Sequence, residues 1–202
     1  QSPDSTPAAS VVHDAANLFV LDASTAGLAS TAQLAQQQVK DFLTKTSDEQ
    51  LFNLFNGGKD KPDDQWVQRL ADLRAAINDG GFAVNVLAMD SASVATSIAA
   101  YAHAGPDGKP TVFINPYWFN LFEGADATKA LIEELGHAVD DYLNPNADTA
   151  GDEGAAFSDV VTGTSQAYGL ATGSDTGTVT VNGQIYDVEF AAFSFETAYQ
   201  IV

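Results

Sequence analysis

Apolar and polar residues alternate along this chain with two different periods. Apolar side chains recur at helical spacing over residues 30–56, 64–78 and 126–143, and a further helix is expected at residues 152–162. Residues 82–89 have apolar side chains at every second position, which predicts a strand. The chain therefore combines several helices with strand-forming sequence.

Two hairpins are predicted from turn-forming residues between short strand-like runs. Gly105–Gly108, with the sequence Gly-Pro-Asp-Gly, is a strong turn signal in the middle of residues 97–115. The dipeptide Asn182-Gly183 divides residues 177–190, and Asn-Gly is the strongest short-range signal for a β-hairpin. Helices, a mixed sheet, two more helices and a final hairpin, in this order, indicate an α+β fold.

The first part of the chain is predicted to be mainly helical. Ser47, with Gln50 three positions later, forms a capping box that divides the first helical segment into two pieces. Residues 11–21 have a mixed apolar pattern that suits a short helix or a strand. We expect residues 1–80 to form an N-terminal helical region and residues 81–202 to form a unit that ends in the C-terminal hairpin. The length of 202 residues also fits one compact domain.

Acidic residues outnumber basic ones by 27 to 8, and the formal net charge is −19. A surface of this charge repels nucleic acids and anionic lipids, so a nucleic-acid partner is not expected. It suits a soluble protein in an extracellular, calcium-rich setting. The lack of cysteine excludes thiol catalysis, disulfides and cysteine-ligated zinc. No apolar run reaches the ~20 residues that a membrane span requires.

The predicted helix at residues 126–143 carries the most reactive side chains of the chain. Glu133 and His137 are four residues apart, so they project from the same side of the helix and could bind one metal ion. Glu134 is offset by one position and would flank such an ion, where a general base belongs. Asp140 and Asp141 lie on the same polar side, and the opposite side is apolar.

A polar helix face is more often exposed to solvent than functional, but three observations favour a metal site. Gly136 occupies the middle of the helix, where glycine costs about 1 kcal/mol relative to alanine, and it would allow a strand or another helix to cross closely. His137 is one of only three histidines in the chain. A second acidic group follows at Asp148, Asp152 and Glu153. If these acids are buried together, a divalent cation would relieve their repulsion.

The segment Glu133–His137, with the sequence Glu-Glu-Leu-Gly-His, resembles the H-E-L-G-H helix of zincin metallopeptidases. The longer block of residues 131–140, 143–144 and 148–154 is similar to a segment of large secreted bacterial proteins that carry hemolysin-type calcium-binding repeats. The resemblance covers residues 82–162. It implies a zincin-like core with a small mixed sheet and a metal-site helix, in a secreted bacterial protein.

The same resemblance implies a metal-dependent peptidase. Glu133 stands at the position of the first metal ligand, His137 at the second, and Glu134 at the general base. The third ligand is expected on the following helix at Glu153, with Asp152 as the alternative. The implied cofactor is a divalent metal, zinc in the first place, and the implied substrate is a peptide or protein whose carbonyl carbon is attacked by water that Glu134 activates.

Glutamate at position 133 departs from the histidine of the zincins. Two negative ligands lower the Lewis acidity of an ion and favour harder metals, so manganese and calcium are alternatives to zinc. The residues would also suit a non-catalytic metal- or calcium-binding module of a secreted adhesin or toxin-like protein. A carboxylate-bridged di-iron site fits the spacing of Glu134 and His137, but it needs two such motifs and the chain has one. His103, in a predicted hairpin, is an extra ligand, a substrate contact or, as is most common, a structural residue.

Overall fold

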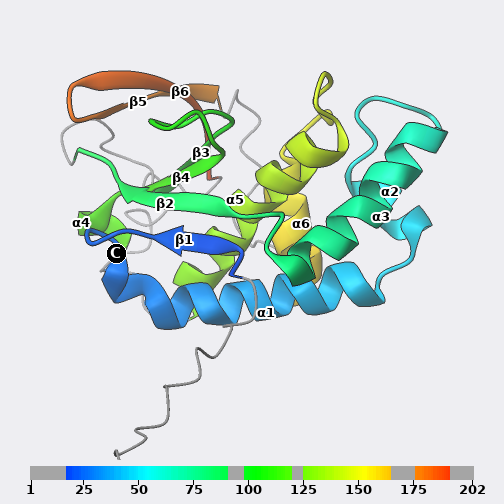
Figure 1. Cartoon of the computed structure of the whole chain (residues 1–202), viewed down its shortest axis with the longest axis horizontal. Coiled ribbons are helices and arrows are strands. Elements are labelled where there is room, and N and C mark those ends of the chain that lie inside the picture. Colours follow the sequence, from blue (N-terminus) through cyan, green and yellow to red (C-terminus); the bar gives the residue numbers. More distant parts are fainter. Residues whose placement is uncertain (1–16, 91–97, 120–124, 165–175, 192–202) are drawn as a thin grey trace, which may run out of the picture.

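A computed structural model of the chain describes residues 17–90, 98–119, 125–164 and 176–191. The strands are β1 (Phe19–Leu21), β2 (Val84–Ala88), β3 (Ala99–Ala102), β4 (Thr111–Ile114), β5 (Thr176–Val181) and β6 (Gln184–Phe190). The helices are α1 (Ala29–Lys45), α2 (Asp48–Leu54), α3 (Asp64–Asp79), α4 (Pro116–Phe119), α5 (Ala125–Leu143) and α6 (Glu153–Thr162), with a short 3₁₀ helix at Ala26–Leu28. In Figure 1, α1 runs below the sheet and α5 passes behind it.

The strands form one six-stranded mixed sheet in the order β1-β2-β4-β3-β6-β5. β1, β2 and β4 are parallel, whereas β3, β6 and β5 pair in antiparallel fashion. The predicted hairpin at residues 97–115 is confirmed, because β3 pairs with β4 from Ala99 opposite Ile114. Helices together with this mixed sheet confirm the α+β class. The parallel pairing of β1, β2 and β4 was not predicted.

Local signals determine where several elements begin and end. Ser47 caps α2, and both hydrogen bonds of its capping box with Gln50 are present. Gly80 ends α3 in the left-handed conformation, with a φ of 87°. Asn182 and Gly183 both have positive φ angles, 50° and 77°, as the tight turn of the C-terminal hairpin requires. The predicted boundaries at Ser47 and at Asn182-Gly183 are confirmed, and α3 ends one residue beyond the expected helix of residues 64–78.

The largest cluster of buried apolar side chains contains residues from before and from after residue 80 in the sequence. Trp66, Leu70 and Leu73 of α3 belong to the same cluster as Leu131 and Leu135 of α5. The N-terminal helices therefore support the helix that carries the site. Among the described helices, none is both long and apolar enough to cross a membrane.

Candidate metal site

The polar face of α5 is buried along with its apolar face. Glu134 is 0% exposed and His137 is 1% exposed, and Glu133 and Asp140 are also buried. α6, β3 and α1 all pack against α5, so that no side of its central turns remains open to solvent. The interpretation of this face as a solvated surface is therefore wrong for these four residues. Buried ionisable groups need partners or a counter-ion, because desolvation penalises their charged forms.

Two glycines allow α6 to cross closely over α5. A Cβ atom added to Gly136 would lie only 2.8 Å from the Cα atom of Gly154, and one added to Gly154 would lie 2.5 Å from Nε2 of His137. Side chains at either position would force the helices apart. The expectation that Gly136 marks a close crossing is confirmed, and the crossing brings the first turn of α6 against His137.

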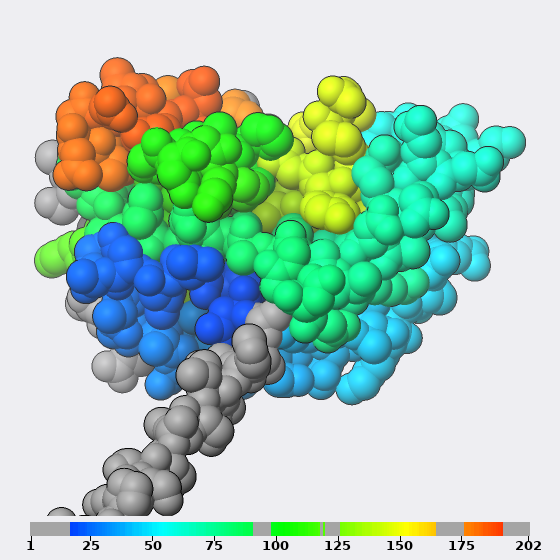
Figure 2. Space-filling model, in the orientation of Figure 1, coloured from blue at the N-terminus to red at the C-terminus, as the bar shows by residue number. Residues whose placement is uncertain are grey.

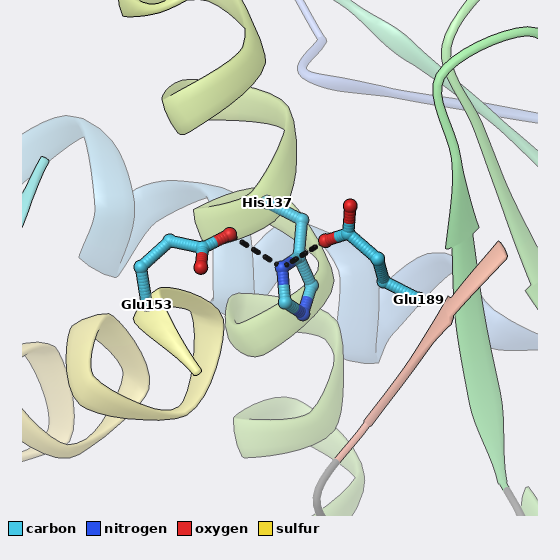
Figure 3. A group of neighbouring side chains, drawn as sticks. All are labelled: His137, Glu153 and Glu189. Atoms are coloured by element: carbon cyan, nitrogen blue, oxygen red, sulfur yellow. Dashed lines mark hydrogen bonds and ion pairs between the residues drawn. The ribbon is translucent and has the colours of Figure 1, made fainter. Parts of the chain in front are cut away.

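Three side chains from different elements meet at Nδ1 of His137 (Figure 3). This atom lies 2.8 Å from Oε1 of Glu153, at the start of α6. It also lies 2.8 Å from Oε2 of Glu189, on β6. The ligand atoms of His137, Glu153 and Glu189 all lie within 4.8 Å of one another, which is close enough to hold one ion. The structure thus brings two of the expected site residues together and adds Glu189.

Hydrogen bonding can satisfy both contacts only if one N–H is shared between the two carboxylates. Nδ1 carries at most one proton, so it cannot donate a separate N–H to the carboxylates of both Glu153 and Glu189. In a tetrahedral zinc site with metal–ligand distances of about 2.0–2.2 Å, neighbouring ligand atoms lie roughly 3.4 Å apart, so the 2.8 Å contacts at Nδ1 would lengthen if an ion entered. One imidazole and two carboxylates are donor types that divalent metal ions accept.

Tyr101 holds the imidazole of His137 from the sheet side. The two rings are stacked, with an interplanar angle of 18°. Tyr101 on β3 lies directly opposite Glu189 on β6, so the strand pairing that positions the ring also positions the carboxylate. The hydroxyl of Tyr101 donates to Oδ2 of Asp141 at 2.7 Å. Burial, followed by the charge of Asp141, raises the pKa of Tyr101 and keeps its hydroxyl protonated.

Glu134 is buried with both carboxylate oxygens unpartnered among the described residues. Burial raises its pKa well above the ordinary value, and the charge of His137 opposes this rise only in part. Burial alone would lower the pKa of His137, but its contacts with Glu153 and Glu189 reverse the direction and raise it. The pocket thus contains more carboxylates than one imidazole can neutralise.

Glu133 and Asp152 lie outside the group of three ligand atoms. Glu133 is buried, but no trio of ligand atoms within 4.8 Å of one another includes it in the described part of the chain. Asp152 caps α6, where its Oδ1 accepts a hydrogen bond from the backbone N–H of Ala155 at 2.7 Å. The cap orients the first turn of α6 and so places the neighbouring Glu153.

Asp140 anchors the loop between α5 and α6. Its carboxylate accepts hydrogen bonds from the side-chain amide of Asn144 at 2.8 Å, the hydroxyl of Thr149 at 2.5 Å and the backbone N–H of Thr149 at 3.2 Å. The Thr149 hydroxyl also accepts from the backbone N–H of Gly57, after α2. Asp140, Asp148 and Glu153 form a second acidic group in the structure, but the partners of Asp140 are those of a structural residue.

Glu189 was missed by the sequence reasoning, although its hairpin was predicted. The signal available was an acidic residue near the end of the last predicted strand, in a run that alternates between Ile185, Asp187 and Glu189 on one face. Its contact with His137 depends on the pairing of β6 with β3, which joins distant parts of the chain.

Comparison of this chain with known protein families, with curated proteins and with solved structures finds no match. The assignment of a function therefore depends on the geometry around His137.

Proposed function

We propose that the chain is a metal-dependent peptidase that binds a divalent ion through His137, Glu153 and Glu189 and uses Glu134 as a general base. The single observation that supports it most strongly is the convergence of two carboxylates, from α6 and β6, on one imidazole nitrogen at 2.8 Å each. Zinc is the ion we propose, because it accepts mixed nitrogen and oxygen ligands at this ligand number. Manganese is the alternative, and the imidazole disfavours calcium, which prefers oxygen ligands.

A bound divalent ion would supply Lewis acidity toward water and toward a substrate carbonyl oxygen. The role of Glu134 is to accept a proton from the attacking water while the oxygen–carbon bond forms. The carbon–nitrogen bond of the peptide then breaks, and Glu134 returns the proton to the leaving amine. Positive charge near Glu134 lowers its pKa, which favours the carboxylate form that a base requires.

A non-catalytic metal site is the second candidate, and the burial of the ligands favours it. His137 is 1% exposed and Glu153 is 5% exposed, whereas the side chain of Glu189 is 33% exposed. Structural zinc sites are closed, whereas catalytic ones keep an open position. In a closed site, the ion would pin the β5–β6 hairpin to α5 and α6 without hydrolysing a substrate.

Metal binding is tested first, with zinc, manganese and calcium as separate probes on protein stripped by a chelator. We expect one equivalent of zinc per chain by elemental analysis and titration calorimetry. Glu189→Gln should weaken binding by more than the roughly 10- to 100-fold that loss of an outer hydrogen-bond partner costs. Glu133→Gln is the control, because Glu133 is an acidic residue of the same helix as His137 but lies outside the group of three.

If Glu133→Gln abolishes zinc binding and Glu189→Gln leaves it intact, the proposed ligand set is wrong. Thermal unfolding of each metal-free variant shows whether a loss of affinity reflects a loss of folding. Hydrolysis is then measured with a mixed peptide library and mass spectrometry. Glu134→Gln should retain zinc and lose cleavage; zinc binding without cleavage in the wild-type protein would favour the closed, non-catalytic site.

A further inference from the structure

A cavity of about 450 Å³ lies beside the metal site, between β3 and the β5–β6 hairpin. Its volume is within the range of roughly 300–1,000 Å³ that is typical of ligand sites. Glu189 lines this cavity and also contacts His137, and Tyr101 lines it while its ring stacks on His137. The cavity therefore shares Glu189 and Tyr101 with the proposed metal site, whereas His137, Glu153 and Glu134 are not among its described lining residues. In Figure 2, the hairpin and the neighbouring β3–β4 segment lie together at the surface of the molecule.

Strand register explains which side chains face this cavity. Glu189 lies opposite Tyr101 on one side and Thr176 on the other, and Asp187 lies opposite Thr178. Tyr101, Glu189 and Thr176 therefore form one row across the three strands, and Asp187 and Thr178 form the next row. Both rows lie on the same face of the sheet, since side chains two positions apart on a strand share a face. His103, two residues after Tyr101, completes the lining.

Among the described residues that line the cavity, two are acidic and none is lysine or arginine. Glu189 belongs to the proposed metal site, and His103 is bound through Nδ1 to Asp141 at 2.8 Å. Asp187 is exposed, and no described residue forms an ion pair or a side-chain hydrogen bond with it. Of the two carboxylates among the described lining residues, Asp187 is thus the one that remains available to a ligand. The net charge of −19 also attracts cations to the molecule as a whole.

We propose that this cavity is the substrate subsite and that it selects a lysine or arginine side chain through Asp187. This inference rests on the proposed peptidase function, because it takes the adjoining metal site as the place of cleavage. The threonine side chains of β5 and the Tyr101 ring provide walls for the aliphatic part of such a side chain, and the carboxylate of Asp187 pairs with its charged end. Acidic side chains are repelled by the same group.

Binding is tested with the zinc-loaded Glu134→Gln variant, which cannot turn over its ligand. Four acetylated and amidated pentapeptides, with lysine, arginine, glutamine or glutamate at the centre of an alanine background, are titrated by calorimetry or fluorescence. The lysine and arginine peptides should bind roughly fivefold more tightly than the glutamine peptide, which is the upper range for an exposed ion pair. The glutamate peptide should bind most weakly, and the differences should shrink at high salt.

Asp187→Asn should abolish the preference and Asp187→Lys should reverse it. Asp60→Asn is the matched control, because it removes the same charge from an exposed residue that does not line the cavity. Equal affinity for the four peptides, no measurable binding of any of them, or the same loss in Asp60→Asn as in Asp187→Asn would overturn the inference.

The two proposals fail separately. Zinc-dependent cleavage without a charge preference would overturn the subsite and leave the peptidase standing. A preference for cationic peptides that depends on Asp187, in wild-type protein that binds zinc but cleaves nothing, would support the subsite as a binding site and overturn the catalytic proposal.

Discussion

The ring of Tyr101 lies against the imidazole of His137, with the ring centroids 6.1 Å apart. Because the phenol also donates a hydrogen bond to Asp141, one side chain connects β3 to two positions of α5. The stacking restrains the imidazole plane, while the pairing of β3 with β6 brings Glu189 to the same nitrogen. The sheet is thereby part of the site and not only its support.

Tyr101→Phe should keep the stacking and remove the hydrogen bond to Asp141. We expect a loss of about 1–2 kcal/mol in the free energy of unfolding in urea, as for a bond to a charged acceptor, with zinc affinity little changed. Tyr186→Phe is the control, since its hydroxyl donates to the exposed side chain of Gln184 and its removal should cost less than about 0.5 kcal/mol. Equal stability of the two variants would argue against a structural role for the Tyr101–Asp141 bond.

Gly154→Ala should destabilise the protein although alanine is the better helix former. The new methyl group would press on His137 and on the carbonyl oxygen of Glu133, and such overpacking costs about 1–3 kcal/mol. Zinc affinity should fall as well, because the helix crossing places Glu153. The control is Gly27→Ala, where nothing lies within 4 Å of the added atom. Urea unfolding measures both; an unchanged midpoint in Gly154→Ala would contradict the close crossing.

Thr149→Val should release the loop between α5 and α6. The substitution preserves shape but leaves Asp140 and the backbone N–H of Gly57 without their hydroxyl partner. The expected total cost is about 1–3 kcal/mol, measured by urea unfolding, because the N–H of Gly57 loses this acceptor while Asp140 keeps its bonds to Asn144 and to the backbone N–H of Thr149. Thr44→Val, at an exposed position of α1, should change stability by less than about 0.5 kcal/mol. If Thr149→Val and Thr44→Val have the same free energy of unfolding, the hydroxyl of Thr149 does not stabilise the loop between α5 and α6.

Glu134 should make the stability of the metal-free protein depend on pH. Its folded-state pKa is raised, mainly by burial, so the folded state holds a proton that the unfolded state loses at a lower pH. The stability that this proton contributes is therefore greatest below the ordinary carboxyl pKa of 4.5. It is lost as the pH rises through the raised pKa of Glu134 in the folded state. Glu134→Gln has no such proton to lose.

Wild-type protein and Glu134→Gln are compared by urea unfolding in the presence of a chelator. The pH runs from 5 to 8, a range of about three pH units that lies above the ordinary carboxyl pKa. Glu134→Gln should gain stability relative to the wild-type protein as the pH increases, by about 1–3 kcal/mol at the upper end. A constant difference between the two proteins across the range would show that Glu134 does not titrate in the folded state.

Signals that act within a few residues were sufficient for most of the fold. Ser47 with Gln50 and the Asn182-Gly183 pair mark boundaries that lie where they were predicted, because a cap or a tight turn depends on its immediate neighbours. The parallel pairing of β1 with β2 involves no such local signal. It joins Phe19 to Val84, and only the packing of intervening helices determines that these strands meet.

The sequence by itself determined that α5 is an amphipathic helix and that Gly136 permits a close crossing, and the resemblance to the zincin helix implied that Glu153 would approach His137. The tertiary structure alone decided that the polar face is buried and that Glu189 meets the same nitrogen. The reason is physical: helical period depends on neighbours along the chain, whereas burial depends on what packs around the helix. A contact between α5, α6 and β6 exists only once the sheet register and the helix crossing are both formed.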